Sequence, residues 1–360
     1  MKHPFVSAGP LAIAAVVAFG GIVSAAAPSL AAATLPNLTG GSSSSAAAVN
    51  DAGQIVGWAT TAAGDQHAVA WQDGAINDLG TLPGHTSSYA TAISRSGLIV
   101  GVSGVGALAP FDPGNENAHA VLWQDGEIID LGTLPGGGYS AATGVNDAGQ
   151  VVGYSRTSVG ALSGATLHGF LWQSGQMTDL PPLQPSSAVL SSTSAASGIN
   201  RQGQIVGDSA SFDFVTNVLT RRAVTWQDGV ITELAAIVGD STSVAVAIND
   251  PGQIVGASGN IDPDLATHAV KWSGRQIRYL ARLAGERFSS ALALNQHGVV
   301  VGQCAVQSGS YGCRWRGNNV SILLPRPGDI GSTAFGINSG GLIVGHSQDA
   351  SFFRAVVWRI

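Results

Sequence analysis

Acidic and amide side chains gather in three polar segments of the sequence, and such oxygen-rich groups are the ligands that Ca²⁺ prefers. These candidate ligand-binding residues are Asp112, Asn115, Glu116 and Asn117, then Asp208 and Asp213, then Asn260, Asp262 and Asp264. None of the segments has the Asp-x-Asp-x-Asp-Gly spacing of a strong calcium loop. We therefore predict no cofactor and keep two alternatives open, a bound Ca²⁺ and ordinary solvated loop residues.

Histidine is the second residue type that could do chemistry, because it binds zinc and transfers protons. His67, His119, His168 and His268 recur at equivalent places in a repeated pattern. Each comes from a different copy of the repeat, so the four side chains cannot converge on one zinc ion. We predict no metal site and interpret these residues as structural, pairing across a sheet or bonding to the backbone.

The sequence contains no motif of a known catalytic machinery. It has no nucleophile elbow with a following acid and histidine, no phosphate loop and no zinc-binding helix motif. A glycoside hydrolase needs two carboxylates across a cleft, and nothing in the sequence pairs Asp65, Glu116, Asp240, Glu286 or Asp329. We predict no catalytic residue, with an extracellular polysaccharide hydrolase or lyase as the alternative.

All these residues are positioned by a pattern that occurs seven times. Each copy begins with a run of small residues, one hydrophobic residue and a position that is usually Asn. Two variable residues, Gly, one further variable residue, two β-branched residues and a second Gly follow, as in Ala46 to Gly57. Copies follow one another at intervals of 43 to 54 residues. The Asn position is occupied by Asn50, Ser94, Asn146, Asn200, Asn249, Asn295 and Asn338.

The spacing of small residues in this pattern predicts a hairpin with a crowded first strand. Asn followed three residues later by Gly is typical of a tight four-residue turn. Ala stands four residues before the Asn position and Ala or Gly two residues before it, as Ala46 and Ala48 do. Since strand side chains alternate, we expect these small residues to line one face. The Gly after the β-branched pair, such as Gly57, is expected to permit close approach of a neighbouring sheet.

Tryptophan occurs once in each copy, at the end of a strand that often reads His-Ala-Val-x-Trp. A tight turn such as Asp73-Gly74 follows, and Leu stands eight residues after each of the first six of these tryptophans. Each copy thus contains four short strands. The tryptophans are Trp71, Trp123, Trp172, Trp226, Trp272, Trp315 and Trp358. We interpret them as packing residues of the repeat, with exposure toward sugars as the alternative.

The seventh copy ends after its third strand, and the missing fourth strand is found at the other end of the chain. Leu35 to Gly40 aligns with Leu79 to Gly84. We expect Thr34–Leu38 to pair with Arg354–Trp358, because such a shared sheet closes a ring and removes a free edge. The sequence predicts an all-β, seven-bladed β-propeller with four antiparallel strands per blade, in which the N-terminal strand closes the last blade.

The two faces of such a propeller differ in the length of their connections. Turns between the first and second and between the third and fourth strands are short and uniform. Connections between the second and third strands are long at residues 103–118, 155–167, 208–221 and 258–267. Variable loops on a rigid scaffold commonly carry binding sites. We therefore predict a ligand surface on the long-loop face, with a channel-mouth site for the enzyme alternative.

The repeat resembles the HAF family of extracellular repeat proteins. The resemblance rests on His-Ala-(Val/Phe)-x-Trp followed by Asp-Leu-Gly-Thr-Leu-Pro-Gly, best seen in His67 to Gly84 and His119 to Gly136. It extends from about residue 34 to the end of the chain. Copies four, six and seven depart from it by carrying Arg222, Tyr311 or Arg354 in place of His. The resemblance implies export and repetition, and no catalytic residues.

The N-terminus predicts export. Lys2 and His3 precede an apolar run from Leu11 to Val23, so residues 1–31 are predicted to be a signal peptide cleaved between 24 and 33; a membrane anchor is the alternative. Residues 32–360 are expected to form one domain that is secreted or periplasmic.

Two further features agree with a domain outside the cytoplasm. The cysteines Cys304 and Cys313 flank a short turn and predict a disulfide. The net charge of −6 disfavours nucleic acid and anionic membranes. We expect a monomeric, non-catalytic binding or scaffold protein with a protein or glycan ligand.

Overall fold

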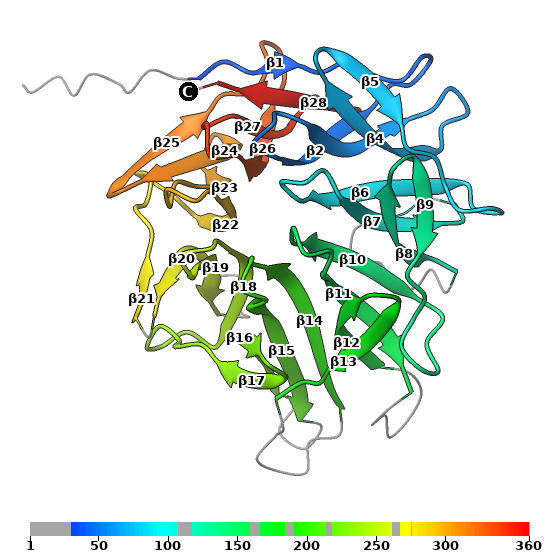
Figure 1. The fold of residues 1–360 in the computed structure, drawn as a ribbon. Coiled ribbons are helices and arrows are strands. Elements are labelled where there is room, and N and C mark those ends of the chain that lie inside the picture. The colour runs from blue at the N-terminus through cyan, green and yellow to red at the C-terminus, as the bar shows by residue number, and fades with distance from the viewer. Residues whose placement is uncertain are drawn as a thin grey trace, which may run out of the picture.

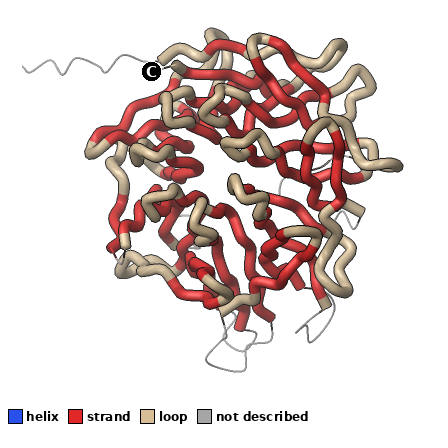
Figure 2. The backbone as a smooth tube through the Cα atoms, in the orientation of Figure 1, coloured by secondary structure: helices blue, strands red, loops and turns tan. Residues whose placement is uncertain are grey.

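The computed structural model describes residues 30–106, 108, 117–158, 166–183, 191–213, 218–260, 267–274 and 276–359 of the 360-residue chain. Regular structure in these residues is β throughout (Figure 2) and comprises 28 strands. No helix among them is long and apolar enough to cross a bilayer. The predicted signal peptide falls almost entirely outside the described residues.

Consecutive strands pair antiparallel into five four-stranded sheets and one eight-stranded sheet. The first three sheets contain β2 (Ser44–Val49), β3 (Ile55–Thr60), β4 (Gln66–Gln72) and β5 (Ala75–Asp78); β6 (Ser87–Ile93), β7 (Ile99–Gly104), β8 (His119–Gln124) and β9 (Glu127–Asp130); and β10 (Ser140–Val145), β11 (Val151–Thr157), β12 (Thr166–Gln173) and β13 (Gln176–Leu180). Two further sheets contain β22 (Phe288–Leu294), β23 (Val300–Val306), β24 (Gly309–Arg316) and β25 (Asn319–Leu323); and β26 (Gly331–Ile337), β27 (Ile343–Gln348), β28 (Phe353–Trp358) and β1 (Ala33–Thr34).

The eight-stranded sheet consists of two four-stranded halves. They contain β14 (Ser191–Ile199), β15 (Ile205–Asp213), β16 (Val218–Gln227) and β17 (Val230–Glu233), and β18 (Thr242–Ile248), β19 (Gln253–Gly259), β20 (His268–Ser273) and β21 (Gln276–Tyr279). A single parallel pair, Arg221 with Thr242, joins them. Figure 1 shows the sheets standing around a common centre, with the first strand of each repeat innermost. The predicted all-β class with four-stranded antiparallel units is confirmed.

The N-terminal strand pairs with the C-terminal strand. β1 lies at the outer edge of the sheet that contains β26 to β28, with Ala33 opposite Val357 and Thr34 opposite Val356. One more bond continues the ladder, from Leu35 N to Ala355 O at 2.9 Å. The strand ends earlier than the predicted Thr34–Leu38 because Pro36 has no N–H to donate.

The prediction that the small residues of the inner strand share one face is wrong. Each inner strand has a β-bulge between them, so that Ala46 pairs with Gly57 while Ala48 pairs with the adjacent Val56. Because Val56 and Gly57 point to opposite faces, so do Ala46 and Ala48. Ala46 packs toward the last sheet and Ala48 toward the second. Small residues are therefore needed on both faces of the inner strand.

The bulge also explains the glycine of the second strand. A Cβ on Gly57 would lie 2.0 Å from the carbonyl oxygen of Ser45, an atom of the bulged strand in the same sheet. The close approach is thus to the paired strand, and the expected contact with a neighbouring sheet is wrong. The turn glycine three residues after Asn50 follows the prediction, because Gly53 has a φ of 80°.

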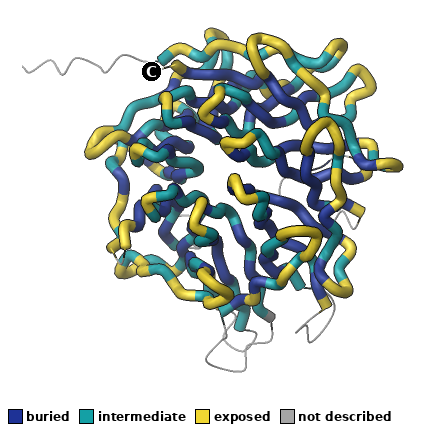
Figure 3. The backbone as a smooth tube through the Cα atoms, viewed as in Figure 1, coloured by how far each residue is buried: buried dark blue, intermediate teal, exposed yellow. Residues whose placement is uncertain are grey.

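Apolar side chains pack between neighbouring sheets, where the buried residues follow the strands (Figure 3). Leu35 and Leu38 pack with Trp71 of the first sheet and Val357 of the last. The predicted disulfide is confirmed: Cys304 on β23 is bonded to Cys313 on β24, and both are fully buried. One predicted loop is largely wrong, because β15 continues to Asp213 and β16 begins at Val218 within residues 208–221.

Candidate functional site

The acidic residues predicted to bind a ligand are only partly described by the structure. Asp112, Asn115, Glu116, Asp262 and Asp264 lie outside the described residues. Asn117 is exposed in the turn before β8, and Asp213 is half-buried at the end of β15.

Asp208 and Asn260 make bonds within the protein. Asp208 is 5% exposed, and its carboxylate accepts two bonds from Arg221 at 2.7 and 2.9 Å. This pairing raises the pKa of Arg221 even though burial acts against it. Asn260 accepts a bond from Ser241 N at 3.0 Å. The side-chain oxygens of Asp208 and Asn260 thus accept hydrogen bonds from other residues of the chain.

The recurring histidines pair with acids of the outer strand. His67 Nδ1 lies 2.8 Å from Asp78 Oδ2, His119 Nδ1 lies 2.8 Å from Asp130 Oδ2, and His168 Nδ1 lies 3.0 Å from Asp179 Oδ1. In the fifth copy His268 instead lies 3.4 Å from Glu286. The described residues contain no group of three or more His, Cys, Asp or Glu side chains placed to hold a metal.

A cluster of titratable groups surrounds His268. Asp240 Oδ2 accepts bonds from Ser258 Oγ at 2.6 Å and from Tyr279 Oη at 2.9 Å. Burial, with the bond to Asp240, raises the pKa of Tyr279 to about 12, so its phenol stays protonated. Burial also lowers the pKa of His268, and the charge of Arg282 lowers it further, against the opposing effects of Glu286 and Asp240. A protonated tyrosine is a poor nucleophile.

Six of the seven repeat tryptophans are buried, and Trp172 is partly exposed. In several of them the indole N–H donates to the backbone of the connection that leaves the preceding sheet. Trp71 donates to Pro36 O at 2.7 Å, Trp272 to Ala235 O at 2.7 Å and Trp315 to Ala281 O at 2.8 Å. This arrangement fits packing between units and leaves these aromatic faces closed to sugars.

The repeated asparagines bond to one another's turns at the centre of the molecule. Asn146 Nδ2 donates to Asn200 O at 3.1 Å, and the same bond runs from Asn249 to Asn295 and from Asn295 to Asn338 at 3.1 Å. Asn338 Nδ2 donates to Asn50 O at 3.1 Å, across 288 residues of sequence. Each of these side chains also accepts a backbone N–H of its own turn through Oδ1, and those of Asn146 and Asn295 accept two. The asparagines therefore join the innermost turns of successive units.

Ser94 interrupts this series, because its side chain is too short to reach Asn146 O. Its Oγ still accepts Leu98 N at 3.0 Å, as an asparagine Oδ1 does elsewhere. We expect Ser94→Asn to raise the free energy of unfolding by about 1 kcal/mol, the net value of one added hydrogen bond. Urea unfolding of the variant measures the gain. Asn338→Ser is the matched reverse change and should lose a similar amount; a loss in both variants would contradict the prediction.

Charged residues that follow the asparagine position converge beside the innermost turns. Arg95 Nη2 lies 2.9 Å from Asp250 Oδ2, although 155 residues separate them, and Arg95 Nε lies 3.6 Å from Asp51. Arg201 lies 3.6 Å from Asp147 and donates its backbone N–H to Asp250 Oδ1 at 3.0 Å. Sequence analysis missed this network because no residue type is constant at its position.

A small cavity of about 200 Å³ lies beside this network. Asn50, Asn295 and Asn338 line it together with Asp51 and Arg95, over apolar side chains such as Val49 and Ile337. The acids of this network already accept protein donors: Asp51 takes bonds from Ser339 N at 2.8 Å and Ser339 Oγ at 3.1 Å. The network is thus polar and internally bonded.

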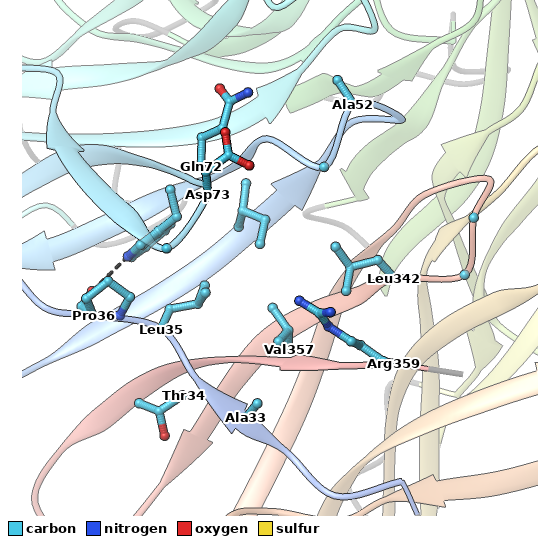
Figure 4. A pocket seen from close by; sticks show the side chains of 16 residues that line it. Ala33, Thr34, Leu35, Pro36, Ala52, Gln72, Asp73, Leu342, Val357 and Arg359 are labelled. Atoms are coloured by element: carbon cyan, nitrogen blue, oxygen red, sulfur yellow. Dashed lines mark hydrogen bonds between the residues drawn. The ribbon is translucent and has the colours of Figure 1, made fainter.

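A larger cavity, of about 780 Å³, lies between the first and last sheets (Figure 4). We call it the junction groove. Leu35, Pro36 and Leu342 contribute apolar surface to it, while Asp73 of the first sheet and Arg359 after β28 stand on opposite sides. Ala33 occupies the position held by larger residues in the other outer strands, such as Ile129 and Arg278. The groove is therefore open because the short β1 replaces a full outer strand.

His346 lies where the last sheet meets the first. Its Nδ1 is 3.1 Å from Ser45 Oγ, and its ring packs against Phe335 and Phe353. Burial lowers the pKa of His346 from 6.5 to about 4. The unfolded chain therefore binds a proton that the folded chain refuses between these pH values, so acid destabilises the fold.

We expect this histidine to remove about 3 kcal/mol of stability between pH 7 and pH 4. His346→Phe removes the titrating group and keeps an aromatic ring between the two phenylalanines. Its free energy of unfolding should fall less steeply with acid than that of the native chain, as measured by urea unfolding at a series of pH values. Parallel curves for the two proteins would show that His346 titrates normally.

Serine carries a role that sequence analysis missed. Six residues before each Asn position stands Ser, in all seven copies: Ser44, Ser88, Ser140, Ser194, Ser243, Ser289 and Ser332. Each of these hydroxyls accepts a backbone N–H from the third strand of the preceding unit, as Ser140 Oγ does from Ala120 N at 2.8 Å. Constancy in all seven copies was the available signal.

Comparisons with known proteins bear on the fold. No protein-family model matches the chain, so the likeness to the HAF family stays a resemblance, and no curated protein matches it. Among solved structures, the β-propeller domain of the Trilobed protease from Pyrococcus furiosus, described as having an open velcro topology, is 10% identical with a TM-score of 0.54; the match covers 88% of this chain and 94% of that one.

Two other solved structures match over a smaller share of their length. A puromycin-hydrolyzing peptidase from Mycobacterium tuberculosis is 12% identical with a TM-score of 0.51, and the match covers 89% of this chain and 52% of that one. An extracellular domain from B. thetaiotaomicron is 10% identical with a TM-score of 0.51, with 92% and 40% covered. This chain spans about half or less of those two proteins. At such identities the likeness is one of fold alone, to the β-propeller.

Proposed function

We propose that the chain is an exported seven-bladed β-propeller that acts as a binding or scaffold protein. Two contacts support a closed ring: the pairing of β1 with β28 completes the last sheet to four strands, and Asn338 donates to Asn50 across the junction. The single parallel pair at Arg221 supports division of the eight-stranded sheet into two blades. The buried disulfide and the N-terminal apolar run support a secreted or periplasmic location.

The observation that carries the binding function is the junction groove. Ligand sites are concave and combine apolar surface with a few polar groups, and this groove of about 780 Å³ has both. Arg359 is exposed at its edge and has no partner among the residues that the structure describes. We propose that it receives an extended segment of a protein partner, with apolar side chains on Leu35 and Leu342 and a carboxylate on Arg359.

The junction groove lies beside the short turns, so it is a different surface from the long loops. The long-loop face remains a second candidate, for a protein or glycan ligand. A monomer without a cofactor suffices for either surface.

The enzyme alternative rests on the convergence of Asp51 and Asp250 at the channel mouth, both on Arg95. A polysaccharide hydrolase needs one carboxyl to give a proton to the leaving group, and a lyase needs a base that removes a proton from the sugar. Here the oxygens of both acids accept bonds from protein groups. This bonding favours a structural role for the pair.

A peptide array probed with the purified full-length chain tests the proposal. Binding of apolar peptides that carry an acidic residue should weaken at least tenfold in Arg359→Ala, which removes the charge, and in Ala33→Phe, which fills the groove. Arg316→Ala is the matched control, because Arg316 is an exposed arginine directly after a repeat tryptophan in another unit. Equal binding by all four proteins would exclude the groove.

A glycan array and a reducing-end assay on polysaccharides test the other readings. Glycan binding that survives Arg359→Ala would assign the ligand to another surface. Release of reducing ends that disappears in Asp250→Asn would establish the enzyme alternative.

A further inference from the structure

His85 and His119 approach each other from neighbouring units. His85 belongs to the connection between β5 and β6, and His119 begins β8. Their ring centres are 6.3 Å apart and their planes stand at 84°. Two imidazoles on one zinc ion, with Zn–N distances of about 2.0–2.1 Å, place their ring centres roughly 5–6 Å apart. The observed separation of the two rings is therefore close to the spacing that a shared ion imposes.

The second nitrogen of each ring is held in the way that metal-binding histidines are held. His119 Nδ1 is bonded to Asp130 Oδ2 at 2.8 Å, and His85 Nδ1 to Ser103 Oγ at 3.0 Å. Such bonds fix the ring orientation and direct the other nitrogen, Nε2, toward a ligand. Neither Nε2 has a partner among the residues that the structure describes. The His119 side chain is 31% exposed, and His85 is half-buried.

We propose that His85 and His119 bind one transition-metal ion, Zn²⁺ or Cu²⁺, through their Nε2 atoms, with water completing the coordination. Imidazole suits both metals. Burial lowers the pKa of His85, and the neighbouring His119 lowers it further, while Asp130 and Ser103 act in the opposite direction. A neutral ring is the form that binds metal. The bound ion would link the first unit to the second.

The repeat supplies matched controls. His67 is the equivalent of His119 in the first unit, makes the same bond to Asp78 at 2.8 Å and is 24% exposed. The residue equivalent to His85 in that unit is Gly41, so His67 has no second histidine at this position. The two turns are equivalent, since His85 N bonds to Leu82 O and Gly41 N bonds to Leu38 O. Substitution of His67 therefore tests whether a single exposed histidine of the repeat is sufficient to bind the metal.

Isothermal titration of the tag-free, chelator-treated chain with Zn²⁺, and separately with Cu²⁺, tests the site. We expect one ion per chain for the native protein, and binding at least about tenfold weaker in His85→Gln and in His119→Gln. Asp130→Asn should weaken binding by roughly 10- to 100-fold through loss of the orienting bond. His67→Gln and Asp78→Asn should bind as the native chain does.

A thermal melt with and without Zn²⁺ gives a second measurement that does not depend on the titration. The native chain should melt higher with the ion, and His119→Gln should not. Absence of saturable binding by the native chain, or an equal loss in His67→Gln, would overturn the proposal. Circular dichroism of each variant establishes that it is folded before titration.

Discussion

Trp272→Ala should lower the free energy of unfolding by about 3–5 kcal/mol, the usual cost of truncating a buried aromatic side chain. Trp272 is 0% exposed and packs with Val206 and Ala245 between two sheet halves. Its indole N–H also donates to Ala235 O at 2.7 Å, so truncation removes a bond to the preceding unit as well as apolar contact. Urea unfolding followed by tryptophan fluorescence and circular dichroism measures the loss.

Trp172→Ala is the matched control for that experiment. Trp172 holds the same place in its unit but is partly exposed, so it removes less apolar surface from water and leaves a smaller cavity. Its loss should be about half that of Trp272. Equal losses at the two positions would mean that the tryptophans stabilise the unit through local hairpin contacts, and that packing between units contributes little.

The repeated strands could be predicted from sequence because two kinds of residue mark them in every copy. The turn glycines need a positive φ that other residues avoid, as Gly53 does at 80°. The tryptophans fill the space between sheets, as Trp272 does. These requirements are local, so they appear directly in the spacing of the sequence.

The bulge of the inner strand could not be predicted in the same way. Alternation assigns Ala46 and Ala48 to one face, and a single extra residue reverses that assignment. The bulge is visible only in the pairing, where Gly57 and Val56 are consecutive partners of residues two apart. The simple alternation of side chains along a strand therefore gives the wrong faces for the inner strand of each sheet.

The junction groove and the charge network around Arg95 depend on contacts between distant copies. Arg95 meets Asp250 across 155 residues, and neither residue recurs in all copies. Ala33 leaves the groove open because its side chain is smaller than those at the same position of other outer strands, such as Ile129 and Arg278. The spacing of the repeat does not predict this difference. Residues that differ between copies do not appear in the repeated pattern. A search for that pattern therefore finds the strands and misses these two features.

The repeated serine makes the strongest case for polar bonding between units. Ser140 is 0% exposed; its hydroxyl accepts Ala120 N at 2.8 Å and donates to Gly132 O at 2.6 Å. Ser140→Ala removes few atoms but strands a donor and an acceptor in a place that water does not reach. Each stranded group costs about 1–3 kcal/mol, so we expect a loss of about 2–6 kcal/mol in urea unfolding.

Ser243 separates this cause from the loss of packing. It is 1% exposed and accepts Ala223 N at 3.0 Å, the bond equivalent to that of Ser140. Since Ser243→Ala deletes the same oxygen but strands the one donor, its cost should be about half that of Ser140→Ala. If the two variants lose the same amount, the shared packing change explains both, and the bond to Gly132 adds no stability. If the loss at Ser140 is the larger, the hydrogen bond to Gly132 stabilises the contact between successive units in addition to apolar packing.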